Sequence, residues 1–140
     1  LSAWWMPQES GIIPSISAGW GINSTGDSSG DAPIKSSTSQ SWYVGLQWDD
    51  AFLKGNALGF AVGQPTFVTS IDRRSSNDDS VADGNYAFEL FYMFQVTDNI
   101  SVTPAIHYFS RPLGEYTGAG VDTSESFNSF GGLIKTTFNF

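Results

Sequence analysis

The chain has 140 residues, six Lys or Arg against fourteen Asp or Glu, one His and no Cys, which is the size of one domain or of part of one. A formal charge of -8 with so few basic residues excludes the clustered Lys/Arg surface that nucleic-acid binding needs. The absence of Cys excludes disulfide scaffolds, thiolate metal sites and Cys nucleophiles. Aromatic residues make up 15% of the chain, which excludes a disordered acidic tail.

No membrane-spanning helix is expected. The longest nearly apolar run, residues 87–94, includes Glu89, whereas such a helix needs about 20 apolar residues. The chain starts at Leu1 and shows no basic segment followed by an apolar one, as a secretion signal would. We therefore expect a mature form or an excised part of a longer protein.

Six segments alternate between bulky apolar residues and small or polar ones. This period of two is typical of β-strands with two unlike faces. The segments are residues 14–23, 41–48, 57–63, 85–96, 100–109 and 129–140, and in each most of the bulky apolar residues fall on even numbers. The sequence therefore predicts an antiparallel all-β fold.

Two kinds of protein fit this pattern. A soluble β-sandwich packs its apolar face inward, whereas an outer-membrane barrel turns that face to lipid and its small, polar face to a lumen. The connections alternate between long and short (residues 24–40, 49–56, 64–84, 97–99 and 110–128), as extended outer loops and tight inner turns require. The short connection at residues 49–55 resembles one helical turn, with acidic residues at its start and Gly55 at its end.

Charge and aromatic residues also favour the barrel. The charged or imidazole side chains inside the strands, Glu89, His107 and Lys135, lie on the small-residue face, which is short of the charges that cover exposed sheets. On the apolar face, aromatic residues lie at strand ends around an aliphatic middle, as interfacial girdles do. The girdle residues that we expect to face lipid are Trp20, Trp42, Trp48, Tyr86, Phe94, Tyr108, Phe138 and Phe140.

We therefore predict that residues 1–140 form about six strands of a larger antiparallel transmembrane β-barrel. Six strands cannot close, because the smallest such barrels have eight. Residues 1–13 would connect from a preceding strand, whose end would be Trp4 and Trp5. The alternative is a soluble, secreted carbohydrate-binding β-sandwich in which Trp20, Trp42 and Trp48 stack on sugar rings.

The small-residue face supplies the residues that we expect to line a lumen. A three-residue loop at 97–99, with Asn99 in the left-handed conformation and Val96 opposite Ile100, would set Glu89 directly across from His107. We expect a polar pair in which the carboxylate favours the imidazolium; a pair with no role in transport is the alternative. The pore-lining candidates are Tyr43, Gln47, Glu89, His107 and Lys135.

Arg73, Arg74 and Arg111 are candidates for a constriction or for the mouth of the pore, because they lie in or beside predicted long loops. The carboxylates near Arg73 and Arg74 lack the spacing of a calcium loop, so we expect no metal, and no cofactor. A barrel enzyme that pairs His107 with Ser101 or Ser110 is the catalytic alternative. We predict that the protein is not an enzyme.

Several runs within these strands carry a further signal. They are PSISAGWG at residues 14–21, WYVGLQW at 42–48, ALGFAVG at 57–63, ELFY at 89–92, VTDNISVTP at 96–104 and the closing FNF at 138–140. These runs resemble the C-terminal part of cyanobacterial outer-membrane porins, which are related to the OprB-type carbohydrate-selective porins. The resemblance covers most of the chain outside the long loops.

The resemblance implies a porin barrel of about 16 strands in the outer membrane of a Gram-negative-type, cyanobacterial organism, with long loops extracellular and the C-terminus periplasmic. It implies passive diffusion of small solutes and inorganic ions, iron among them, through a water-filled barrel. It also implies a homotrimer, and Phe140 resembles the signal by which the barrel-assembly machinery recognises such chains. Acidic loops predict a weak, salt-sensitive preference for cations.

Overall fold

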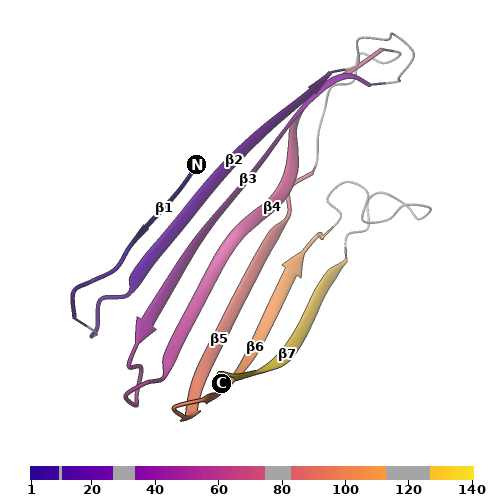
Figure 1. The fold of residues 1–140 in the computed structure, drawn as a ribbon. Helices are drawn as coiled ribbons and strands as arrows, with labels where there is room; N and C mark the ends of the chain where they lie inside the picture. The colour runs from indigo at the N-terminus through magenta and orange to yellow at the C-terminus, as the bar shows by residue number, and fades with distance from the viewer. Residues whose placement is uncertain (10, 27–33, 75–82, 113–126) are drawn as a thin grey trace.

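The protein is described here by a computed structural model that covers residues 1–9, 11–26, 34–74, 83–112 and 127–140. These ranges form a single antiparallel sheet in which the strands lie side by side in chain order (Figure 1). The strands are β1 (Ser2–Trp5), β2 (Ser15–Gly26), β3 (Ile34–Asp49), β4 (Ala57–Arg73), β5 (Tyr86–Thr97), β6 (Ile100–Ser110) and β7 (Asn128–Phe138). The sheet is not closed, since β1 and β7 do not pair with each other. The predicted all-β fold, an open part of a barrel, is confirmed.

The connections lie at two ends of this sheet. Residues 6–14, 50–56 and 98–99 join strands at what we call the short-turn end, and the C-terminus lies there too (Figure 1). The strand ends that the remaining three connections join lie at the opposite end of the sheet, which we call the long-connection end. The part of the chain that the structure describes contains no helix of the length and apolarity that a membrane crossing needs.

One strand more than the six predicted is present. Strand β1 pairs with β2 from Ser2 opposite Gly19 to Trp5 opposite Ile16. Its four residues are too few to show an alternating pattern, although Trp4 and Trp5 were expected at the end of a strand. Residues 1–13 thus contain a strand as well as a connection.

The strands at the long-connection end reach further than predicted. Strand β3 has 16 residues, whereas a tilted strand needs about 9–11 to cross a membrane. In Figure 1, β2, β3 and β4 extend past the other strands at this end. The polar run at residues 34–40 has no apolar face that could reveal a strand, and three register shifts between β3 and β4 interrupt the alternation of β4.

Two predicted turns differ in detail. The β5–β6 turn has two residues, 98 and 99, and not three. Val96 forms a bulge between Gln95 and Thr97, so Thr97 rather than Val96 lies opposite Ile100. Asn99 is not in the left-handed conformation. The pairing of β5 with β6 beyond the bulge is nevertheless the predicted one, because the bulge adds one residue to β5 where the prediction added one residue to the loop.

The turn at residues 50–56 is not helical. Asp50 and Phe52 have φ angles of 55° and 64°, and Gly55 has 87°. Left-handed residues interrupt a right-handed helical turn. The backbone N–H of Gly55 instead donates to Asp50 Oδ1 at 2.8 Å, which closes the turn.

The sheet has almost no core of its own. The buried apolar residues in the described ranges are Ala57, Ile71 and Ala105. Large apolar side chains on the even-numbered face stay exposed, for example Phe130 (71%) and Ile134 (75%). A β-sandwich would cover that face with a second sheet, and the described residues form only one. The sandwich alternative therefore lacks its second layer.

Candidate functional site

Between the short-turn end and Gly63 of β4, the strand register assigns each residue of the sheet to one of two faces. Residues directly opposite each other in antiparallel strands lie on the same face. Trp20 pairs with Trp42, and Gly19 with Tyr43. From β2 to β7, up to Gly63 in β4, the even-numbered residues therefore form an aromatic face and the odd-numbered residues a small-residue face. In β1 the numbering is reversed.

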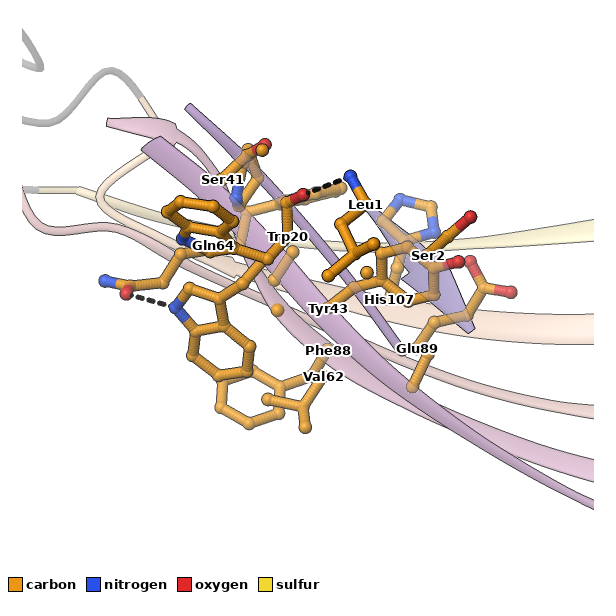
Figure 2. A pocket seen from close by; sticks show the side chains of 18 residues that line it. Leu1, Ser2, Trp20, Ser41, Tyr43, Val62, Gln64, Phe88, Glu89 and His107 are labelled. Atoms are coloured by element: carbon orange, nitrogen blue, oxygen red, sulfur yellow. Dashed lines mark hydrogen bonds between the residues drawn. The ribbon is translucent and has the colours of Figure 1, made fainter. Parts of the chain in front are cut away.

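All five predicted pore-lining residues lie on the small-residue face. Glu89 is directly opposite His107, as predicted. Tyr43 is opposite Gly63, Gln47 opposite Gly59, and Lys135 opposite Thr103. Figure 2 shows Tyr43, Glu89 and His107 on one side of the ribbon and Val62 and Phe88 on the other. The sheet thus brings the predicted wall together, although Glu89 and His107 form no ion pair with each other.

Large rings on this face lie over glycines of the neighbouring strand. In each case the glycine is the residue directly opposite the ring, and a Cβ added to it would overlap the ring atoms. The pairs are Tyr43 over Gly19, Phe91 over Gly59 and His107 over Gly131. The imidazole of His107 is therefore turned toward β7 and away from Glu89 on β5, which explains the missing ion pair.

Three aromatic residues of this face were not among the predicted wall residues. Trp4 pairs with Ser17, Phe91 with Gly59, and Phe109 with Ala87. The odd numbers of Phe91 and Phe109 were a sufficient signal, whereas the face of Trp4 depends on the register of β1. A groove of about 500 Å³ on this face is lined by Ser2, Tyr43, Glu89, His107 and Phe109, among others (Figure 2).

The aromatic face carries seven of the eight predicted girdle residues, and the ring of Phe140, which follows β7, stacks on that of Phe138. At the long-connection side, Trp20 Nε1 donates to Gln40 Oε1 at 3.1 Å and Trp42 Nε1 donates to Gln64 Oε1 at 2.6 Å. Gln40 lies beyond Trp42 in the direction of the long connections, where the face becomes polar. An indole with an apolar body and a satisfied N–H at a polar border is typical of an interfacial girdle.

The aromatic residues at the short-turn end follow a line that crosses the sheet obliquely. Trp48 pairs with Leu58 and Leu58 with Tyr92, and the same register continued across β5 and β6 reaches Ile134. Phe138 lies four residues beyond Ile134, about 13 Å at about 3.3 Å per residue. Over four strand spacings of about 4.8 Å, the line is inclined by about 35°. Because barrel strands are tilted by about 35–45°, this line would lie level in a membrane.

The family model described as carbohydrate-selective porin, OprB family, matches residues 2–140. The chain belongs to the OprB family. It is 27% identical over 135 residues to the uncharacterized protein sll0772 of Synechocystis sp., covering 93% of this chain and 23% of that protein. It is 27% identical over 100 residues to the uncharacterized protein alr4550 of Nostoc sp., covering 71% of this chain and 15% of that protein. No solved structure matches it.

Membership in the OprB family confirms the resemblance seen in the sequence, and both relatives are cyanobacterial. The family's porins are outer-membrane channels rather than enzymes. The chain spans about a quarter of the length of sll0772 and less of alr4550.

The arginines expected at the mouth of this OprB chain lie at the long-connection end. Arg73 ends β4 and Arg74 follows it, while Arg111 follows β6 with a φ of 49°. Each of the three has an interaction partner. Nearby, Lys35 Nζ and Asp72 Oδ2 form an exposed ion pair at 2.9 Å. The acidic residues at positions 78 and 79 lie outside the described residues.

The strand geometry of this OprB chain separates the residues of the catalytic alternative. Ser101 shares a face with His107 but lies six residues away along β6, about 20 Å at about 3.3 Å per residue. Ser110 lies on the opposite face. Neither hydroxyl is within hydrogen-bond reach of the imidazole. In the described ranges, no three His, Cys, Asp or Glu side chains cluster to hold a metal ion.

Proposed function

We propose that the protein containing this chain is a porin through which small polar solutes diffuse passively across the outer membrane. The observation that carries this proposal is the separation of the sheet into two faces. The aromatic face is exposed, apolar and bordered by aromatic residues, as a lipid-facing surface is. The small-residue face carries Glu89, His107, Lys135 and Gln47, which suit a water-filled lumen.

The wall supports passage of both sugars and inorganic ions. Exposed Tyr43 and half-buried Phe91 offer apolar ring surface, and exposed Gln47 and Glu89 offer hydrogen-bonding groups beside them, a combination that suits sugars. Charges of both signs, Glu89 and Lys135, suit small hydrated ions. Iron is among the ions that the protein would pass, as a transported solute and not as a bound cofactor.

We further propose the orientation and partners of the protein. The long connections face the cell exterior and the C-terminus faces the periplasm, since porins have longer extracellular than periplasmic loops. Arg73, Arg74 and Arg111, at the exterior end, act on charged solutes at the mouth. The barrel-assembly machinery recognises Phe140. Three copies of the protein associate in the membrane.

Single-channel current recorded from the full-length protein in a planar lipid bilayer tests this function. A porin gives stepwise, ohmic conductance, and in a salt gradient its reversal potential reports ion preference. Reduced conductance in the presence of added sugar would establish that sugars enter the lumen. A protein that gives no steps and stays soluble without detergent would contradict the proposal, because its aromatic face would then be covered by protein.

A further inference from the structure

The turn between β3 and β4 holds a bulky residue in a conformation that such residues rarely adopt. Phe52 has a φ of 64° and is 85% exposed. Left-handed backbone in an aromatic residue is an outlier that the surrounding structure must maintain. Leu53, the next residue, is also 66% exposed. The turn therefore presents two adjacent apolar side chains at the short-turn end of the sheet.

A hydrogen-bond network ties this turn to β5. Tyr92 Oη donates to the carbonyl oxygen of Ala51 at 2.7 Å and accepts from Asn56 Nδ2 at 2.9 Å. Asn56 Oδ1 accepts from the backbone N–H of Gln95 at 2.9 Å, and Asn56 is only 5% exposed. The turn thus has one preferred conformation, and the exposure of Phe52 is built into it.

The hydrogen-bond network and an aromatic ring contact hold the turn against the aromatic face. The rings of Phe52 and Tyr92 have centroids 5.9 Å apart, and Tyr92 lies on the aromatic face opposite Leu58. The β1–β2 connection approaches the same face, because Trp48 Nε1 donates to the carbonyl oxygen of Ile12 at 2.9 Å. A groove of about 340 Å³ between the two connections is lined by Ile12, Trp48, Phe52 and Leu58, among others.

We propose that Ile12, Ile13, Phe52 and Leu53, which we call the turn patch, bind phospholipid in the membrane leaflet at the short-turn end. Ile12 and Ile13 are 94% and 63% exposed. The patch is continuous with the aromatic face through Trp48 and Tyr92, so lipid that covers that face also reaches the patch. Asp49, Asp50 and Lys54 beside it are exposed, so the apolar patch has a charged border, as an amphipathic surface at a membrane interface does.

This inference rests on the proposed function, because it takes the aromatic face to contact lipid. The function itself does not require it, since a porin turn with polar side chains would remain in water. With the turn patch in lipid, two connections outside the strands are also immersed and fix the depth of the barrel at this end.

Spin labels on single cysteines in the full-length protein, reconstituted in phosphatidylcholine vesicles, test the proposal. Residues 1–140 contain no Cys, and any Cys elsewhere in the protein is first replaced by Ser. Leu53→Cys and Ile12→Cys label the patch and leave Phe52 in place, Leu90→Cys labels the middle of the aromatic face, and Ser36→Cys labels the polar extension of β3. Power saturation compares collisions with oxygen, which is enriched in lipid, and with a water-soluble nickel chelate.

We expect the labels at Leu53 and Ile12 to favour oxygen, with a ratio shifted to the side of Leu90 and away from Ser36. Labels that favour the nickel chelate would overturn the proposal by placing the patch in water. Labels that neither reagent reaches would overturn it by placing protein over the patch. If Leu90 itself favours the nickel chelate, the proposed function fails as well; if only the patch labels do, the function stands without this inference.

Discussion

The imidazole of His107 lies over Gly131, the residue directly opposite it on the neighbouring strand. A side chain at position 131 would occupy the space that the ring takes. The ring therefore lies along the wall, toward β7, and leaves Glu89 without an ionic partner on that side. The same relationship links Tyr43 to Gly19 and Phe91 to Gly59. The absence of a side chain at these three glycines thus allows the opposite rings to lie close to the sheet.

Gly131→Ala should reduce the conductance of the channel. The added methyl group overlaps the ring of His107, which is the mobile end of a side chain and can move away from the sheet. If the small-residue face lines the lumen, the displaced ring narrows it, and single-channel current falls. The double variant Gly131→Ala, His107→Ala should recover the lost current, because it removes the displaced ring.

The matched control for this prediction is Gly132→Ala. Gly132 lies on the aromatic face, where the nearest atom to an added Cβ is the carbonyl oxygen of Ala105 at 3.4 Å. Its conductance should equal that of the unaltered protein. A fall in current with Gly132→Ala and none with Gly131→Ala would mean that the two faces have been assigned the wrong way round.

Gly63→Ala should destabilise the barrel more than Gly132→Ala does. A Cβ at Gly63 would lie 2.5 Å from the carbonyl oxygen of Trp42 and 3.0 Å from Cα of Tyr43, which are backbone atoms of β3 and cannot rotate away. Overpacking of this kind costs about 1–3 kcal/mol. The midpoint of urea unfolding in vesicles, followed by tryptophan fluorescence, measures the difference. Equal midpoints for the two variants would show that β3 and β4 can separate freely.

Asn56→Ala should lower the free energy of unfolding by about 1–3 kcal/mol, because it removes the two hydrogen bonds of a buried amide, to Tyr92 Oη and to the backbone N–H of Gln95. Asn23→Ala is the control, since Asn23 is exposed and its amide donates to Thr25 Oγ1, two residues away in the same strand. The same urea titration compares the two. An Asn56 variant as stable as the control would mean that the turn is not held by this network.

Neutralising the charged residues of the wall should shift ion preference in opposite directions. Glu89→Gln removes a negative charge from the lumen and should move the reversal potential toward anions, whereas Lys135→Gln should move it toward cations. Lys54→Gln makes the same substitution in a turn outside the lumen and should change it little. The shifts should shrink as salt rises, because screening shortens the range of each charge. Shifts of the same sign from Glu89→Gln and Lys135→Gln would contradict a shared wall.

The sequence was most informative where each strand has one apolar and one polar face. Parity predicted that Glu89, His107 and Lys135 share one face, because a pleated strand cannot change face without a bulge. Parity together with a three-residue loop at 97–99 predicted that Glu89 lies opposite His107. The alternation of apolar and polar residues did not predict the parts of the strands that lie beyond the apolar band. Residues 34–40 continue β3 without any apolar residue after Ile34, since both faces of the sheet are polar there. Such a strand is held by its backbone pairing with β2 and β4.

The conformations of rings and turns depend on contacts between strands that sequence patterns do not contain. Position 131 is 24 residues from His107 in the chain, so the direction of the imidazole became apparent only with the register of β6 and β7. Likewise, residues 49–55 have the composition of a helical turn, but Tyr92 on another strand bonds to the carbonyl oxygen of Ala51.

The proposed pore requires that alternate residues of β5 and β6 face a water-filled lumen and lipid. The most direct test introduces single cysteines at Glu89, Leu90, Phe91 and Ile106 in the full-length protein and applies a charged, membrane-impermeant thiol reagent during bilayer recording. Cysteines at Glu89 and Phe91 should react and lower the current, whereas those at Leu90 and Ile106 should not react. Equal reaction at all four positions, or reaction only at Leu90 and Ile106, would contradict the two-faced pore wall.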